Sequence, residues 1–422
     1  MGIEVDGALI VVGASLLALG LLSRVIKRIF LSTVLLALLV GVAVGPEELA
    51  VIDPTSTAEA RRVMEELARI TLAIALMGAG LHVTRGDLRE NARRCISLLG
   101  VGMIGMWAMT GLGGWLLLDL PFWAGFLLGA ILTPTDPVVA STLVTGPLAE
   151  GNLPRRLRRT LQIESGGNDG LALPFVLLAA YMLTRPHGEA FTDWAGDAAK
   201  EIGLAIAIAL LLGYVAGKLA EASLRMAEIE QPNLLGVGLA LALLTLGLVH
   251  ALGGSGILAV FVAALTFSAM LEEQVRERVE EVQETVTKFF ILPAFVAFGA
   301  ILPFSEWAAL GVPGLLFAAW VLLLRRPPVA PIALAGTDTD RRSKAFLAWF
   351  GPLGVAAIYY ATFIERFPIA ESETIFAAAS LAICMSVVVH SITATPGVRL
   401  LAGRSPFATL RHPLDPDSET AP

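Results

Sequence analysis

The chain has 422 residues, of which 56% are hydrophobic and only 16% are charged. That balance is too apolar for a soluble domain of ordinary composition and predicts a membrane protein. The formal net charge of −7 argues against a nucleic-acid partner, which would need Lys and Arg clustered on one exposed face. Cys95 and Cys384 are expected to be inert, so the sequence indicates neither a disulfide framework nor a thiolate metal site.

Apolar runs long enough to cross a bilayer recur along the whole chain. A hydrocarbon core of roughly 30 Å needs about 20 apolar helical residues, and by this measure we predict about 13 transmembrane helices. The runs begin near Ala8, Ile29, Ile70, Cys95, Phe122, Thr160, Ile202, Leu234, Gly256, Thr285, Pro313, Lys344 and Thr374. The first run lacks a small-residue cleavage site, so we expect it to be retained as a span.

The sequence predicts a single membrane domain. It would cover residues 1–398 and be followed by a short cytoplasmic tail, residues 399–422. The longest connector, residues 46–66, is acidic and is expected to carry a surface helix.

The distribution of basic residues predicts the orientation. Placing the amino terminus outside puts about 22 of the 30 Lys and Arg residues in the cytoplasm and leaves about six on the other side. Trp123, Trp194 and Trp307 then lie at the outer interface, as an aromatic belt would place them. We therefore predict a multi-pass protein of the plasma (inner) membrane with its carboxyl terminus in the cytoplasm.

Span 6 carries a group of polar side chains that is expected to lie inside the membrane. Helical periodicity places Glu164 over Asn168 and Ser165 over Asp169, so these four side chains form one stripe. Asp169 lies about ten residues into the span, on the order of 15 Å deep. Such stripes can simply join helices, but two carboxylates at membrane depth favour a functional site.

Spans 5 and 12 are each expected to be interrupted. Pro134 and Pro137 cannot both lie in one continuous helix, and Asp136 before Pro137 is the pattern of a helix start at mid-membrane. A simple proline kink would leave Asp136 unexplained. Residues 351–354, Gly-Pro-Leu-Gly, interrupt span 12, and paired interruptions in two halves of a chain indicate a transporter binding site.

Span 11 contains two adjacent arginines, Arg325 and Arg326. The apolar run before them is only about 20 Å long, so they must lie inside the span for it to cross the membrane. A buried arginine needs a carboxylate partner, and Glu164 is the candidate. We expect one of the two arginines to extend to the cytoplasm instead, and we expect His390 in span 13 to be packed or hydrogen-bonded rather than a proton relay.

The motifs of spans 5 and 6 resemble those of the NhaP-type branch of the cation:proton antiporter 1 family, a group that is Na+/H+ exchanger-like. The residues that carry the resemblance are Thr135, Asp136, Pro137, Glu164, Ser165, Asn168 and Asp169. The resemblance covers nearly the whole chain. It implies an all-α fold with an inverted repeat of six-helix units, two discontinuous crossing helices (spans 5 and 12), and a homodimer with interleaved dimerisation and core subdomains.

The resemblance also implies roles for individual residues. Asp169 would bind either a proton or a monovalent cation, and Asp136, Ser165 and the Thr135 carbonyl would complete the cation's shell. Glu164 and Asn168 are expected to be further ion-binding residues of the same site, with Glu164 also in a structural ion pair with Arg326. An Asn-Asp pair in place of two aspartates is typical of the electroneutral branch, which exchanges one proton for one cation.

Two positions depart from the family pattern. Leu353 stands where relatives often carry an arginine, and Gly166-Gly167 replace a bulkier pair. We expect the first departure to change how the charges near the broken helices are balanced.

The expected function is secondary active exchange of Na+, or else Li+ or K+, for H+ by alternating access, serving pH homeostasis, without a cofactor and without enzymatic activity. A K+/H+ antiporter of the same fold is the main alternative. A cation channel or an intramembrane aspartyl enzyme is less well supported, since no pore-loop repeat is found and the enzyme leaves Asn168 and Arg326 without a part. A pH-gated sensor is a further alternative.

Overall fold

The computed structural model describes residues 2–21, 32–46, 48–49, 57–136, 147–225 and 231–403. Within these ranges the chain forms helices joined by short connectors, and none of these residues lies in a strand. The basic cluster Arg24, Lys27 and Arg28, the residue Pro137 and the tail 404–422 fall outside the described residues.

The first half of the chain forms helices that lead up to the polar stripe. They are α1 (Gly2–Leu21), α3 (Thr33–Val44), α4 (Thr57–Leu81), α5 (Arg85–Ser97), the π-helix η1 (Leu98–Gly102), α6 (Met103–Leu117), α7 (Phe122–Ile131), α9 (Pro147–Asn152) and α10 (Arg155–Thr184).

The second half of the chain contains two very long helices and several short ones. They are α11 (His187–Arg225), α12 (Gln231–Ala251), α13 (Gly256–Ser268), α14 (Glu273–Ala300), α15 (Phe304–Trp320), the π-helix η2 (Val321–Arg325), α16 (Val329–Ala333), α17 (Arg341–Trp349), α18 (Val355–Phe363), the 3-10 helix η3 (Ile364–Arg366) and α19 (Ser372–Leu401).

The described helices agree with a multi-pass membrane protein. Five segments are long and apolar enough to cross a bilayer: Arg85–Leu117, Arg155–Thr184, Gly188–Ser223, Phe304–Ala333 and Ser372–Leu401. Four shorter apolar helices are Thr33–Val44, Phe122–Ile131, Gly236–Ala251 and Gly256–Ser268. The number of spans, about 13 by the length rule, stays a prediction.

Residues 57–66 differ from what the sequence led us to expect. They do not form a separate surface helix but are the first turns of α4, which continues unbroken to Leu81. The physical reason is that two charged residues of this segment, Arg61 and Glu65, are buried in ion pairs with η3 and α19. Charged residues that the sequence led us to place at the surface thus form ion pairs with the rest of the bundle.

Both predicted interruptions are present, and they lie against each other. Span 5 is helical only to Ile131 and non-helical from residue 133 to 136, while span 12 is non-helical between Trp349 and Val355. The backbone N–H of Asp136 donates to the carbonyl of Pro352 at 2.8 Å. Each proline removes a donor and bends the chain, so the two breaks supply each other with partners.

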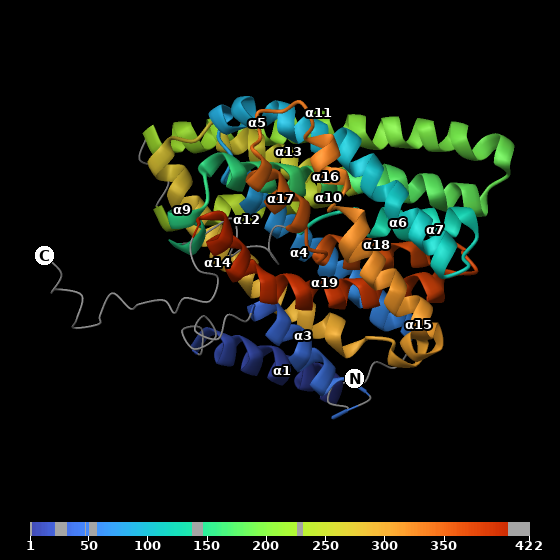
Figure 1. The fold of residues 1–422 in the computed structure, drawn as a ribbon. Coiled ribbons are helices and arrows are strands. Elements are labelled where there is room, and N and C mark those ends of the chain that lie inside the picture. The colour runs from blue at the N-terminus through green and yellow to red at the C-terminus, as the bar shows by residue number, and fades with distance from the viewer. Residues whose placement is uncertain are drawn as a thin grey trace, which may run out of the picture.

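The helix α10 occupies the centre of the bundle. It packs against α5, α7, α11 and α13, while α19 packs on α15 and α18. In Figure 1, α1 lies along the lower edge, α11 along the upper edge, and α17 and α19 lie on the face toward the viewer. The polar stripe of α10 therefore sits deep between helices rather than at a surface.

Candidate functional site

The polar stripe of span 6 lies half-way along α10. Glu164, Asn168 and Asp169 are fully buried, and Ser165 is 4% exposed. Placing so many polar groups inside the bundle costs free energy unless they are paired or bind a ligand. The partners of each side chain therefore define the site.

The glycines within the stripe allow neighbouring helices to come close. A Cβ atom at Gly166 would overlap the ring of Phe261 in α13, and a Cβ at Gly167 would lie 2.8 Å from Cδ1 of Leu99 in η1. A bulkier pair could not be accommodated without moving those two side chains. The Gly166-Gly167 departure from the family pattern is thus matched by large apolar neighbours.

Asn168 joins the stripe to the break in span 5. Its Oδ1 accepts from the backbone N–H of Thr135 at 3.1 Å, and its Nδ2 donates to Oγ1 of Thr135 at 2.8 Å and to Glu164 at 2.9 Å. Both amide hydrogens and the amide oxygen are therefore engaged. Asn168 organises the site in this structure, while the Oγ atoms of Thr135 and Ser165 lie 3.1 Å apart beside it.

Asp136 lies where the two breaks meet. It is 3% exposed, and its Oδ2 accepts from the backbone N–H of Val355, the first residue of α18, at 2.7 Å. Gly354 packs directly against this carboxylate, because a Cβ there would overlap it. A carboxylate at a helix start is stabilised by the free N–H groups and by the helix dipole, so α18 fixes the position of Asp136.

Asp169 has no hydrogen bond to either carboxylate oxygen among the described residues, although its side chain is completely buried. Its backbone carbonyl accepts from the hydroxyl of Tyr360 at 2.6 Å. Asp136 and Glu164 both lie within electrostatic reach of it. A buried carboxylate without a partner is unstable as a bare anion, so Asp169 needs a proton or a cation.

Glu164 is paired with Arg326, the partner expected from the sequence. Nη1 and Nη2 of the arginine donate to Oε1 and Oε2 of Glu164 at 2.8 Å and 3.0 Å, and Nε donates to the carbonyl of Leu347 at 2.7 Å. Arg326 is 2% exposed. With both its oxygens held in this way, Glu164 compensates Arg326 rather than presenting a free charge to an ion.

The expectation that one arginine extends to the cytoplasm was wrong, because Arg325 is also buried, at 3% exposed. Its Nη1 donates to the carbonyls of Leu132, Thr133 and Pro134 at 2.9, 3.2 and 3.3 Å, and its Nη2 donates to the carbonyl of Gly351. Carbonyl groups at a helix end lack intrahelical donors. One guanidinium therefore donates hydrogen bonds to backbone carbonyls of both breaks.

The two arginines lie at the end of the π-helical turn η2. It ends at Arg325, and the two consecutive arginines reach different targets from it. A π-turn shifts the register of the helix and is often found at functional sites. Sequence periodicity at 3.6 residues per turn gave no signal of it.

The break in span 12 is apolar at Leu353, one of the two positions expected to depart from the pattern of the resemblance. Leu353 is fully buried, and its backbone N–H donates to Oγ of Ser386 at 2.9 Å. The guanidinium of Arg325 lies against the neighbouring Gly351. The positive charge at this break is thus provided from span 11. His390, as expected, is buried and bonded, with Nε2 3.0 Å from the carbonyl oxygen of Trp349.

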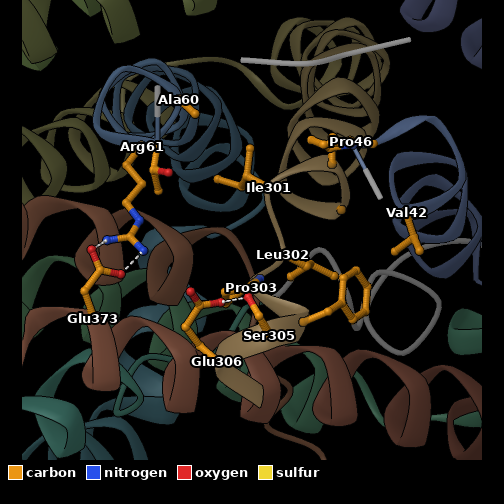
Figure 2. Close-up of a pocket in the computed structure, with 15 residues that line it drawn as sticks. Val42, Pro46, Ala60, Arg61, Ile301, Leu302, Pro303, Ser305, Glu306 and Glu373 are labelled. Atoms are coloured by element: carbon orange, nitrogen blue, oxygen red, sulfur yellow. Dashed lines mark hydrogen bonds and ion pairs between the residues drawn. The ribbon is translucent and has the colours of Figure 1, made fainter. Parts of the chain in front are cut away.

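The sequence did not single out a cluster of ion pairs at the amino-terminal ends of α4 and α19. Arg61 bridges Glu365 at 2.7 Å and Glu373 at 2.5 Å, and Arg366 lies 2.6 Å from Glu65. Figure 2 shows Arg61 against Glu373 at the edge of a cavity of about 330 Å³, which Glu306 also lines. These charges lie close to span ends, where solvation is the ordinary expectation, so no sequence signal marked them.

The described residues contain no group of three or more His, Cys, Asp or Glu side chains placed to hold a metal ion. Both cysteines are free thiols, Cys95 buried and Cys384 partly so. The polar groups that do converge are Asp169, Asp136, Ser165 and Thr135, around two broken helices.

This fold and this site define a multi-pass membrane protein with buried carboxylates at the junction of two interrupted helices. The transmembrane family of sodium/hydrogen exchangers matches residues 12–400, and the chain belongs to that family. Membership places it in a class of transporters and not of enzymes.

Individual relatives are named as antiporters of different cations. A probable Na(+)/H(+) antiporter of Schizosaccharomyces pombe is 29% identical over 80% of this chain and 46% of its own length. A second Na(+)/H(+) antiporter of that yeast is 27% identical over 92% of this chain and 89% of its own length. The K(+)/H(+) antiporter NhaP2 of Shewanella baltica is 27% identical over 92% of this chain and 66% of its own length. The chain spans less than half the length of the first of these relatives.

The fold matches that of a solved structure along nearly the whole chain. The sodium proton antiporter MjNhaP1 from Methanocaldococcus jannaschii superposes with a TM-score of 0.73 over 95% of this chain and 100% of that one, at 22% identity. This likeness concerns the fold, not the transported ion.

Proposed function

We propose that this protein exchanges a monovalent cation for a proton across the membrane, and that both compete for Asp169. The observation that carries the proposal is the buried carboxylate of Asp169, which has no hydrogen bond among the described residues. Such a group needs one positive partner at a time. A proton and a cation would each satisfy it, and neither could bind while the other is present.

The neighbouring oxygen atoms suit a hard monovalent cation. Hydroxyl, carboxylate and carbonyl oxygens favour hard ions over soft ones. The hydroxyl of Ser165 lies 3.1 Å from Oγ1 of Thr135, whose backbone carbonyl is the oxygen that we expect to bind the cation, and Asp136 is held at the adjoining helix start. We infer that these three residues complete the cation's shell around Asp169.

Fixed charges around the site support electroneutral exchange. Glu164 is neutralised by Arg326 through two hydrogen bonds, and Arg325 is bonded to backbone carbonyls. Asp136 is held by the backbone N–H of Val355 at the start of α18, so Asp169 is the group that we expect to change its occupant. One cation would cross for each proton, with no net charge moved.

The transported ion is Na+ in our proposal, with Li+ as a further substrate. K+ is the second candidate, because relatives of similar identity are named as Na(+)/H(+) and as K(+)/H(+) antiporters. We also propose alternating access in a homodimer of the plasma (inner) membrane, with the amino terminus outside, the carboxyl terminus in the cytoplasm and a role in pH homeostasis.

The test is proton movement in proteoliposomes with an imposed pH gradient, followed by a pH-sensitive dye as Na+, Li+ or K+ is added. Asp169→Asn is expected to abolish cation-driven proton movement. Glu306→Gln, an exposed carboxyl at the edge of the cavity in Figure 2, is the matched control and should remain active. Full activity of Asp169→Asn would overturn the proposal, and a rate that depends on membrane potential would overturn the electroneutral part.

A further inference from the structure

A groove runs between α17 and the last turns of α19, and the proposed exchange does not account for it. It encloses about 580 Å³, and its lining is mostly apolar. Phe346 and Trp349 of α17 form one wall, and Pro396, Gly397 and Leu400 of α19 form the other. Both helices lie on the face toward the viewer in Figure 1.

Exposed apolar side chains continue along α19 beside this groove. The α19 residues that line it belong to the segment Ser372–Leu401, which is long and apolar enough to span a membrane. On the same stretch of helix, Leu400 is 59% exposed and Ile392 is 55% exposed. Large apolar side chains exposed on such a helix are typical of a surface that contacts lipid.

The walls of the groove are fixed by specific contacts. A Cβ atom at Gly397 would overlap the ring of Phe350, so α19 and the end of α17 are packed together there. The indole Nε1 of Trp349 donates to Oγ1 of Thr393 at 3.0 Å. The groove is therefore a preformed feature of the two helices, as binding sites for small apolar ligands usually are.

Arg342 brings positive charge to one end of the groove, and two further basic residues lie on the same turn of helix. Arg341, Arg342 and Lys344 occupy the first turn of α17, and within the described residues none of them forms an ion pair. Arg342 itself lines the groove. Asp340 is engaged otherwise, because its Oδ1 accepts from the backbone N–H groups of Arg342 and Ser343 at 3.0 and 3.1 Å.

The connector before α17 shows a contrast, because its acidic residue is paired with basic residues. There Arg94 lies 2.7 Å from Asp338, and Arg156 lies 3.8 Å from the same carboxylate. Basic residues that face the protein are thus matched by an acidic residue, while those beside the groove are left for something outside the chain.

We propose that the groove binds an anionic phospholipid from the leaflet at that end of α19. An acyl chain would lie along Phe346, Trp349 and Leu400, and the phosphate-bearing headgroup would contact Arg342 and its basic neighbours. Lys and Arg at a membrane surface attract anionic lipids, and Trp favours the interface between headgroups and acyl chains. A zwitterionic lipid would fill the groove but would leave the positive charges unmatched.

Lipid bound here would contact α17, the helix that leads into the break of span 12. The carbonyl of Trp349 is hydrogen-bonded to His390 at 3.0 Å, and the carbonyl of Gly351, two residues on, accepts from Arg325. An occupied groove would hold α17 in this position. The lipid requirement can be measured without any transport assay, so it stands apart from the proposed exchange.

The experiment is fluorescence quenching of Trp349 by lipids with brominated acyl chains. The full chain and its Trp349→Phe variant are reconstituted in phosphatidylcholine containing a minor fraction of brominated phosphatidylglycerol or brominated phosphatidylcholine. The difference between the two proteins isolates the signal of Trp349. Phosphatidylglycerol is expected to quench it more strongly than phosphatidylcholine.

Matched variants separate headgroup recognition from general lipid contact. Arg342→Gln, which changes the basic residue that lines the groove, should weaken apparent affinity for phosphatidylglycerol about fivefold, while Lys288→Gln on α14 should leave it unchanged. Equal quenching by both lipids would overturn the proposal. Absence of quenching by either lipid, restored in a chain ending at Gly403, would also overturn it and identify the carboxyl-terminal tail as the occupant.

Discussion

Arg326 holds the carboxylate of Glu164 with two hydrogen bonds, of 2.8 Å and 3.0 Å, inside the helical bundle. Both residues are at most 2% exposed, so neither charge has water to replace its partner. The pair brings together α10 and the end of η2, which are far apart in the sequence. Its main effect is to keep a second carboxylate beside Asp169 from acting as a free charge.

Breaking this pair should destabilise the protein strongly. Glu164→Gln leaves a buried arginine uncompensated, for which we expect a loss of about 3–5 kcal/mol in the free energy of unfolding. The control is Lys218→Gln, which removes an exposed pair with Glu221 and should cost about 0–1 kcal/mol. Denaturant unfolding in detergent measures both, and equal effects of the two variants would contradict the burial argument.

Arg325 is expected to be needed for an ordered site rather than for binding the ion directly. Arg325→Gln leaves carbonyls of both breaks without donors, at about 1–3 kcal/mol for each buried group left unsatisfied. We expect exchange to fall by at least about tenfold, the equivalent of 1.4 kcal/mol. Arg325→Lys should recover only part of it, because an ammonium cannot span both breaks as a guanidinium fork does. Full recovery by Lys, in rates normalised to folded protein, would contradict this role.

Gly354 should not tolerate a side chain. A methyl group there overlaps the carboxylate of Asp136 and must displace it from the start of α18. We therefore expect Gly354→Ala to lose most exchange activity. Gly247→Ala in α12, where a Cβ meets nothing within 4 Å, is the control for a helical glycine. Proteoliposome flux compares them, and equal activity of the two variants would exclude a positional role for Gly354.

The loss of stability expected for a substitution at Gly166 in α10 should be reversed by a second substitution. Gly166→Ala places a methyl group in the ring of Phe261 and should cost about 1–3 kcal/mol of stability through overpacking. Phe261→Leu removes the overlapping ring atoms, so the double variant should be more stable than Gly166→Ala alone. Thermal melting of the three variants measures this coupling. Strictly additive losses would show that the two residues do not oppose each other.

Asp338, in the connector before α17, gives a pH dependence outside the membrane. Loss of hydration opposes its ionisation, but the hydrogen bond and charge of Arg94 outweigh that effect, and the pKa of Asp338 lies below its ordinary value. A lowered folded-state pKa adds stability above the unfolded value, about pH 4, and that stability is lost as pH falls further. Asp338→Asn should therefore melt earlier than the unmodified chain near pH 7, and the two should converge as pH falls below the lowered pKa of Asp338. A gap that persists in acid would contradict the ion-pair explanation.

Much of the architecture could be predicted because it follows from local rules. Pro134 and Pro352 cannot continue a helix, so both breaks were visible in the sequence. The stripe from Glu164 to Asp169 follows from helical periodicity, and the pairing of Glu164 with one of the two adjacent arginines follows from the cost of isolated charge.

The remaining features depend on geometry that local rules do not contain. The two adjacent arginines lie at the end of the π-turn η2, whose register a 3.6-residue period does not describe. The first turns of α4 looked like a surface segment because the acidic partners of Arg61 lie some 300 positions later, at separations of 304 and 312 residues. The roles of Asn168 and Arg325 as organisers of backbone groups were likewise not visible, since carbonyl partners carry no sequence signal.

The most direct test of the central claim is the pH dependence of cation affinity in proteoliposomes. If one proton and one cation compete for Asp169, the half-saturating Na+ concentration should rise about tenfold for each unit by which pH falls on the acidic side, with an unchanged maximal rate. That result would support a single shared carboxylate. A half-saturating concentration independent of pH, with only the maximal rate changing, would contradict competition at Asp169.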